Sequence, residues 1–270
     1  MAPTLYKLSD DAFNSLTLPP CADDHHPCSS GMFTLLLDVT DTVVNHYYDT
    51  QCVLFDNKPI HAEIGGLRGL ARCADLKLAG FALPAGSCAA PWPMDLLGIA
   101  YDESIDYNDP GFNLYPNNNF DFYSLTITRQ GGPTYTVPIT PALSPPVLGP
   151  DPFKGTQRVG DPGERCEQDI PGCTVPPHPL KFYDLLSQID LRIFDAVCAA
   201  TLLPPFAPPA GFGLKRADPQ QGTPGECCGY AIQLYAQDKT WSNGHAGGLH
   251  HILTPAWAIC ICNDLPASRG

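Results

Sequence analysis

Basic residues are scarce in this chain. Lys and Arg together number 15 among 270 residues, against 28 Asp and Glu, which gives a net charge of −13. Proteins that bind nucleic acid carry basic patches, so this balance excludes a nucleic-acid partner. Charged residues of both signs make up only 16% of the chain, below the roughly 25% of typical globular proteins. No stretch approaches the roughly 20 apolar residues that cross a bilayer, so we expect no membrane span.

The sequence also lacks the common signatures of enzymes. It contains no Gly-x-Ser-x-Gly, no His-Glu-x-x-His and no phosphate-binding loop. We therefore expect no enzymatic activity and no catalytic residues. Residues 1–7 lack a charged segment followed by an apolar run, which is the pattern of a secretory signal. If the protein is exported, we expect this chain to be a fragment or a processed product.

Cysteine, proline and glycine are abundant instead, at 12, 30 and 24 residues. So many thiols would stay reduced and reactive in the cytosol, whereas an oxidising compartment converts them to disulfides. The high proline and glycine content favours turns and loops over helices. Together these features predict a disulfide-bearing, loop-rich protein of the cell surface or the extracellular space.

Alternating apolar and polar residues predict antiparallel strands in an all-β fold. The first two, over residues 33–40 and 48–55, are expected to form a hairpin. The clearest alternation lies in residues 123–128. The glycines and proline at 130–133 form a turn signal, so a paired strand is expected over residues 135–139.

Two long strands are expected near the end of the chain, over residues 230–237 and 256–262, and a short one over 97–101. Residues 182–200 fit either a helix or a strand. We favour a strand over residues 188–194, because its neighbours are all β. Residues 141–179 are rich in proline and glycine, and they hold two cysteines. A free loop of that length is unusual in a compact domain, so we expect a linker or an insertion held by its cysteines.

Gly31 begins an alternating strand, and a second strand closes on the sequence Val-Leu-Phe-Asp-Asn-Lys-Pro at residues 53–59. This pair resembles the last two strands of a bacterial Ig-like surface module. Tyr230, within Gly-Tyr-Ala-Ile-Gln-Leu, is similar to the tyrosine that begins the sixth strand of an Ig-like sandwich, where it can make a corner contact. The Cys…Trp…Cys spacing of antibody domains is absent.

The resemblance implies an antiparallel Ig-like β-sandwich with long, cysteine-pinned insertions. Residues 1–58 would then be a segment with a strand pair from a preceding or partnering module. Residues 59–265 would be a complete sandwich with the insertion at 141–179. The resemblance further implies display or adhesion at a cell surface, and it supplies no catalytic residues.

Eleven of the cysteines are disulfide candidates. Three local pairs would close short loops, each contributing roughly 2–4 kcal/mol. A terminal group of four cysteines comes together if the last two long strands are neighbours, and it could bridge internally or to Cys198. The alternatives are mostly free thiols, or zinc held by the four terminal thiolates, although the spacing of these cysteines lacks the usual knuckle pairs. The local pairs are Cys21–Cys28, Cys73–Cys88 and Cys166–Cys173, and the terminal group is Cys227, Cys228, Cys260 and Cys262.

Two further groups could bind metal ions. Histidines near one another can hold a transition metal, and an acidic, Asn-rich loop offers the oxygen ligands that calcium prefers. In both cases an exposed polar loop explains the same composition. The transition-metal candidates are His245, His250 and His251, and the calcium candidates are Asp102, Asp106, Asn108, Asp109 and Asp121.

Three functions remain open from the sequence. The first is a structural or adhesive module that contacts a protein or glycan at a cell surface. The second is a fibre subunit that assembles with copies of itself, using residues 31–58 for strand exchange. The third is a calcium-assisted carbohydrate-binding module, because aromatic residues flank the acidic loop and can stack on sugars. No cofactor other than calcium is expected.

Overall fold

The computed structural model describes most of the strands and their connections. The described residues are 31–40, 42–44, 46–55, 60–70, 73–81, 87–102, 120–143, 147–160, 183–241 and 249–267. The chain divides into two compact units, of which one contains the first two strands and the other contains nearly all of the remaining described residues.

The first two strands form a sheet of their own. β1 (Gly31–Thr40) pairs with β2 (His46–Phe55) along their full length, from Gly31 opposite Phe55 to Thr40 opposite His46. The hairpin predicted from the alternating pattern is therefore confirmed. At the turn and on β2, the large side chains of Val43, Val44, Tyr47 and Tyr48 are exposed.

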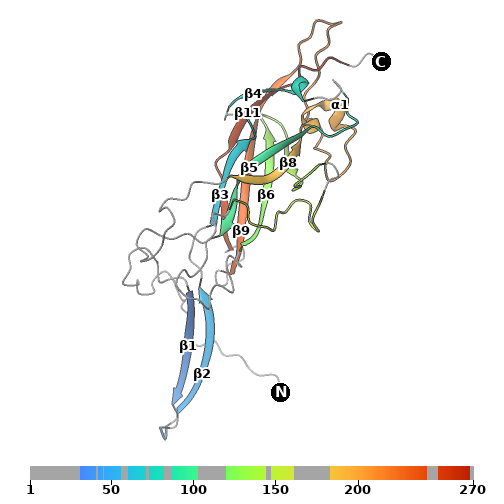
Figure 1. Cartoon of the computed structure of the whole chain (residues 1–270). Helices are drawn as coiled ribbons and strands as arrows, with labels where there is room; N and C mark the ends of the chain where they lie inside the picture. Colours follow the sequence, from blue (N-terminus) through green and yellow to red (C-terminus); the bar gives the residue numbers. More distant parts are fainter. Residues whose placement is uncertain are drawn as a thin grey trace, which may run out of the picture. The chain divides into compact units, whose positions relative to one another are not determined.

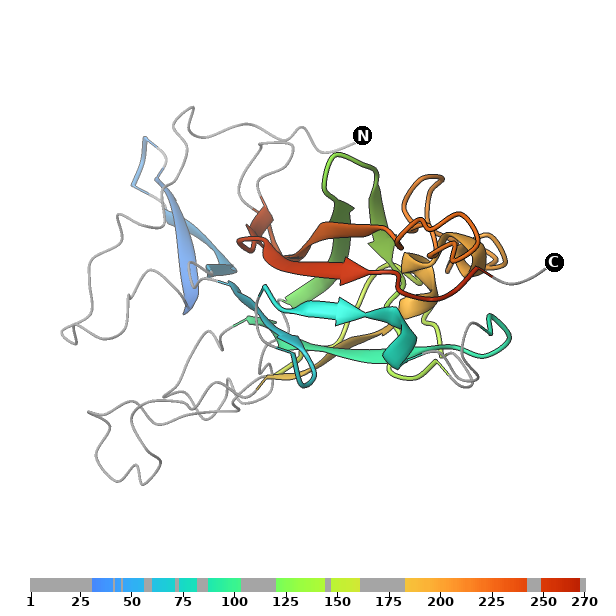
Figure 2. The same cartoon turned by 90° about the horizontal axis from the view of Figure 1, so that it is seen from above.

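The larger unit contains two sheets (Figure 1). One is antiparallel and three-stranded, in the order β3 (Ile60–Leu67), β5 (Pro93–Asp102) and β8 (Asp184–Asp190). The other follows the order β4 (Asp75–Lys77), β11 (Trp257–Cys262), β9 (Cys227–Trp241), β6 (Phe120–Arg129) and β7 (Thr134–Val137), and β10 (Leu249–Leu253) pairs with β9. Figure 2 shows the three-stranded sheet as a layer across from the layer that contains β9 and β11.

The core lies between these sheets because apolar residues alternate along their strands. On β9 the inward residues Tyr230, Ile232 and Leu234 are almost completely buried, and so are Ile259 and Ile261 on the neighbouring β11. An aromatic group fills one end, where the rings of Phe194 and Phe212 pack against the ring of Tyr230. The Tyr230 hydroxyl donates a hydrogen bond to the Phe212 carbonyl at 2.7 Å, so its polar end is satisfied in the core.

The all-β prediction is confirmed, with two corrections of detail. β4 and β11 run parallel, so the larger sheet is mixed rather than purely antiparallel. The strand expected over residues 188–194 ends at Asp190, and residues 191–194 form the 3-10 helix η4 (Leu191–Phe194), which is followed by the single turn of α1 (Ala196–Ala199). The Asp190 carboxylate accepts a hydrogen bond from the Arg192 amide, which caps η4 and ends the strand.

Candidate functional site

A disulfide joins the loop before β5 to the helix after β8. Cys88 and Cys198 are separated by 110 residues in sequence, their sulfurs are 2.01 Å apart, and their Cα atoms are 5.0 Å apart. Cys198 is positioned by α1, which begins because the Asp195 carboxylate accepts hydrogen bonds from the amides of Val197 and Cys198. The disulfide therefore links the loop before β5 to the helical turn after β8, although the two segments are remote in sequence.

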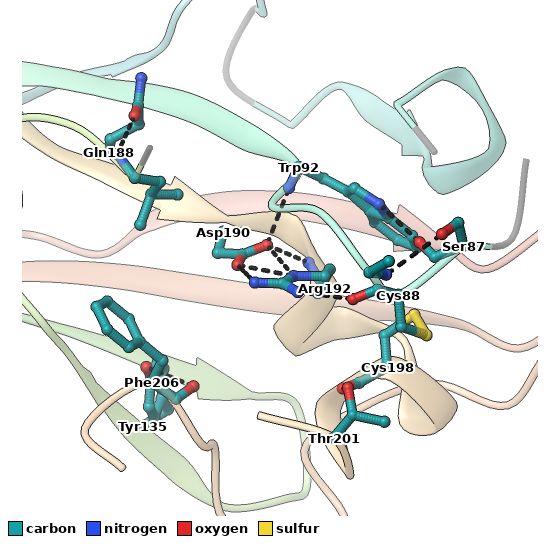
Figure 3. A network of polar contacts seen from close by, with 12 residues as sticks. Ser87, Cys88, Trp92, Tyr135, Gln188, Asp190, Arg192, Cys198, Thr201 and Phe206 are labelled. Atoms are coloured by element: carbon teal, nitrogen blue, oxygen red, sulfur yellow. Dashed lines mark hydrogen bonds and ion pairs between the residues drawn. A yellow bond between two sulfur atoms is a disulfide. The ribbon is translucent and has the colours of Figure 1, made fainter. Parts of the chain in front are cut away.

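Two arginine–aspartate pairs surround this disulfide (Figure 3 shows the first). The Arg192 guanidinium lies 2.6 Å from the Asp190 carboxylate and also donates to the Cys88 carbonyl at 2.7 Å. The same carboxylate accepts the Trp92 amide at 3.1 Å. The pair thus links β8 to the loop that carries Cys88.

The second pair is more deeply buried. Arg216 Nε lies 2.7 Å from the Asp195 carboxylate, and the exposed fractions of the two side chains are 4% and 0%. Arg216 Nη2 also lies 3.3 Å from Cys198 Sγ, so its guanidinium packs against the disulfide. We call Cys88, Cys198 and the two ion pairs the Cys88–Cys198 network. A buried charge without its partner is very unfavourable, so each pair depends on the fold around it.

A third arginine fastens a long irregular segment to the larger sheet. Arg129, at the end of β6, donates to the carbonyls of Gly211 and Gly213 at 2.7 and 3.0 Å, and it forms an ion pair with Glu226. Glu226 in turn accepts the Lys215 amide at 3.0 Å. These contacts provide hydrogen-bond partners for backbone groups of residues 211–215, which lie outside the named strands.

The terminal cysteines form one disulfide and leave two thiols. Cys227 on β9 lies directly opposite Cys262 on β11, and their sulfurs bond. Cys228 faces the other side of β9, as expected for neighbouring residues of a strand, and it is a free thiol, as is Cys260. Burial and a hydrogen bond to the Asp75 carboxylate raise the pKa of the Cys260 thiol.

One predicted pair and two alternatives are therefore wrong, and the disulfide candidates Cys228 and Cys260 form no bridge. Cys73 is an exposed free thiol, and its amide donates a hydrogen bond to the Ala258 carbonyl on β11, so the local Cys73–Cys88 bridge does not form. A bridge from the terminal group to Cys198 does not form either, because Cys198 is bonded to Cys88. A zinc site with four thiolate ligands is contradicted, since two of the four sulfurs are consumed in a disulfide.

The described structure does not bring the candidate metal ligands together into one site. Asp102 is buried at the end of β5, and Asp121 on β6 accepts a hydrogen bond from Gln237. The ring of His251 stacks on that of Tyr235, with centroids 5.7 Å apart. Within the described ranges, no group of three or more His, Cys, Asp or Glu side chains could hold a metal ion. The candidates that lie outside the described residues or side chains are Cys21, Cys28, Cys166, Cys173, Asp106, Asn108, Asp109, His245 and His250.

The sequence patterns did not predict the ion pairs of the network. Asp195, just before Ala-Val-Cys-Ala, is a capping signal that could have indicated the helix turn. Nothing in the sequence indicates that Arg216 reaches Asp195 or that Cys88 reaches Cys198, because both contacts depend on tertiary folding.

Comparison with protein-family models, curated proteins and solved structures found no match to this chain. No helix in the described residues is long and apolar enough to cross a membrane. The two disulfides among the described residues indicate that the protein matures in an oxidising compartment.

Proposed function

We propose that this chain is a structural and adhesive module of an extracellular or cell-surface bacterial protein. The observation that carries the proposal is the Cys88–Cys198 network, in which a disulfide across 110 residues and two buried ion pairs fasten the same end of the sandwich. With the Cys227–Cys262 bridge, these links resist unfolding by force or heat, as a module at a surface must.

The charges of the network support a structural role rather than a catalytic one. The partners of Asp190, Arg192, Asp195 and Arg216 include one another, backbone groups and the disulfide sulfurs, and all four side chains are at least 86% buried. Acid–base catalysis instead needs a titratable group within reach of a substrate. These groups are held where they stabilise the fold.

Single-molecule stretching tests the mechanical part of the proposal. When the oxidised chain unfolds under force, the segments closed by the two disulfides remain closed. Adding reductant to the stretched molecule then releases them. At about 3.5 Å per residue, we expect one step of about 380 Å from the separation of 110 residues and one of about 120 Å from that of 35. Absence of the longer step would contradict the proposal.

Labelling of intact source cells with an antibody tests the location separately. Labelling without permeabilisation is expected for a surface module. Labelling that requires permeabilised cells would refute the assignment to the surface or the extracellular space, whatever the stretching experiment gives.

A fibre subunit is the second candidate, and the hairpin of β1 and β2 favours it. An isolated two-stranded sheet is marginally stable in water, yet this one extends over ten residue pairs. It exposes 65% of Tyr47 and 57% of Tyr48. Pairing with the hairpin of another copy would cover such side chains and give each strand a further neighbour.

Concentration-dependent filaments, seen by light scattering and electron microscopy, would support this second candidate. We expect them to disappear in Tyr47→Ser/Tyr48→Ser. The control is Leu203→Ser, which changes a side chain of the larger unit that is 78% exposed. Filaments in the tyrosine variant, or none in the unmodified protein, would remove the candidate.

A further inference from the structure

A short segment joins the two sheets of the larger unit. Gly155 exchanges two backbone hydrogen bonds with Tyr123 on β6, and Val159 exchanges two with Ala100 on β5, all at 2.9 Å. We call residues 155–159 the closing segment. Its close approach to β6 requires glycine, because a Cβ atom at Gly155 would overlap the Tyr123 ring.

A pocket of about 460 Å³ lies beside the closing segment. This volume falls within the roughly 300–1,000 Å³ of small-molecule sites. The partly buried side chains of Ile139, Leu148 and Leu185 give the pocket apolar surface, and Val147 adds a side chain that is 56% exposed. A ligand with an apolar part would remove this surface from water, which is favourable.

The charged groups at this pocket are balanced within the protein. The Lys154 ammonium lies 3.9 Å from the Asp151 carboxylate and 4.4 Å from the centre of the Phe122 ring, over which it packs. Arg158 has an interaction of its own, and the Asp184 carboxylate accepts the amide of the next residue at 2.7 Å. With two cations and two carboxylates in place, the pocket has no excess charge of either sign to select an ionic ligand.

Two polar residues of the lining are not committed to the fold. Thr156 and Gln157 are exposed and lie between the two backbone bridges of the closing segment. Within the part of the chain that the structure describes, neither residue makes a hydrogen bond through its peptide group or its side chain. A hydroxyl and a carboxamide both donate and accept hydrogen bonds, so this pair matches the hydroxyl groups of a ligand, which also do both.

We propose that this pocket binds a neutral glycoside, in which a hydroxyl-bearing sugar ring is attached to a short apolar body. Thr156 and Gln157 exchange hydrogen bonds with the sugar hydroxyls, and the leucine and isoleucine side chains contact the apolar body. An ionic ligand would leave water without gaining an opposite charge, which is unfavourable. The pocket shares no residue with the Cys88–Cys198 network, so this proposal and the structural role are tested separately.

Titration calorimetry of the full chain with hexyl glucoside tests this assignment. Glucose, which lacks the apolar body, and hexanoate, which carries a charge in place of the sugar, serve as comparison probes. We expect saturable hexyl glucoside binding that is at least tenfold tighter than that of either comparison probe. Absence of saturable binding, or equal affinity for glucose or hexanoate, would overturn the proposal.

Variants locate the binding. Thr156→Val/Gln157→Leu is expected to weaken hexyl glucoside affinity about tenfold through the lost hydrogen bonds, and both side chains are exposed, so the fold should tolerate the change. The matched control is Thr136→Val/Gln221→Leu, which changes an exposed Thr and an exposed Gln outside the pocket lining and should leave the affinity unchanged. Equal loss in both variants, or no loss in the first, would show that the pocket is not the site.

Discussion

Removal of the Cys88–Cys198 disulfide should cost more stability than removal of the Cys227–Cys262 disulfide. A disulfide limits the entropy of the unfolded chain in proportion to the logarithm of the loop that it closes. For the sequence separation of 110 residues this amounts to about 4.8 kcal/mol, and for 35 residues to about 3.8 kcal/mol. The two closed segments share no residues, so their contributions should add.

The variants are Cys88→Ala/Cys198→Ala and Cys227→Ala/Cys262→Ala, compared with Cys73→Ala, which removes an exposed free thiol. Urea unfolding without reductant measures the free energy of unfolding. The first variant should lose slightly more than the calculated loop contribution, because Cys198 is completely buried and its sulfur contacts Arg216. The control should stay within about 0.5 kcal/mol of the unmodified protein.

Two results would refute this reasoning. One is a Cys88→Ala/Cys198→Ala variant that unfolds within about 1 kcal/mol of the unmodified protein, since the bond would then not constrain the unfolded chain. The other is a larger loss in the Cys227→Ala/Cys262→Ala variant, because the order of the two losses follows directly from the loop lengths.

Two further outcomes follow from the charged groups. Arg216→Met leaves the buried Asp195 carboxylate without its cation, and should lower the free energy of unfolding by about 3–5 kcal/mol in urea titrations. The control Lys215→Met changes an exposed neighbouring residue and should alter the free energy of unfolding little. Equal losses in the two variants would contradict the ion-pair argument. The hydrogen bond from the Tyr183 hydroxyl to Glu63 raises the pKa of Tyr183 to about 12. The contribution of this bond to the stability of the fold is therefore complete below pH 10 and is lost as the pH rises through 12. NMR titration of the Tyr183 ring should show this pKa fall towards 10 in Glu63→Gln, and an unchanged value would disprove the cause.

The strands with regular alternation could be predicted from the sequence, whereas β3 could not. In residues 123–127 of β6 and 230–236 of β9 every second residue is apolar and faces the core, so the pattern is visible without a structure. In β3 the alternation fails at a bulge between Ile64 and Gly66, where Gly66 adopts a φ of +124°. Such a backbone favours glycine, and the bulge shifts the register of the strand.

The candidate site was only partly predictable, because its contacts join distant residues. Alternation predicts that Cys227 and Cys228 face opposite sides, and neighbouring terminal strands bring the four cysteines together, but only the register of β9 and β11 shows that Cys227 pairs with Cys262. Cys88 has no such pattern near it, and the shorter separation from Cys73 favoured the wrong partner. Its true partner depends on the cap at Asp195, which turns Cys198 into α1.

Peptide mapping of native protein, alkylated without reductant, tests most directly whether disulfides fasten this module. We expect mass spectrometry to find Cys88 joined to Cys198 and Cys227 joined to Cys262, with the exposed Cys73 alkylated. Alkylated Cys88 and Cys198 in folded protein would contradict the proposed structural role of the network.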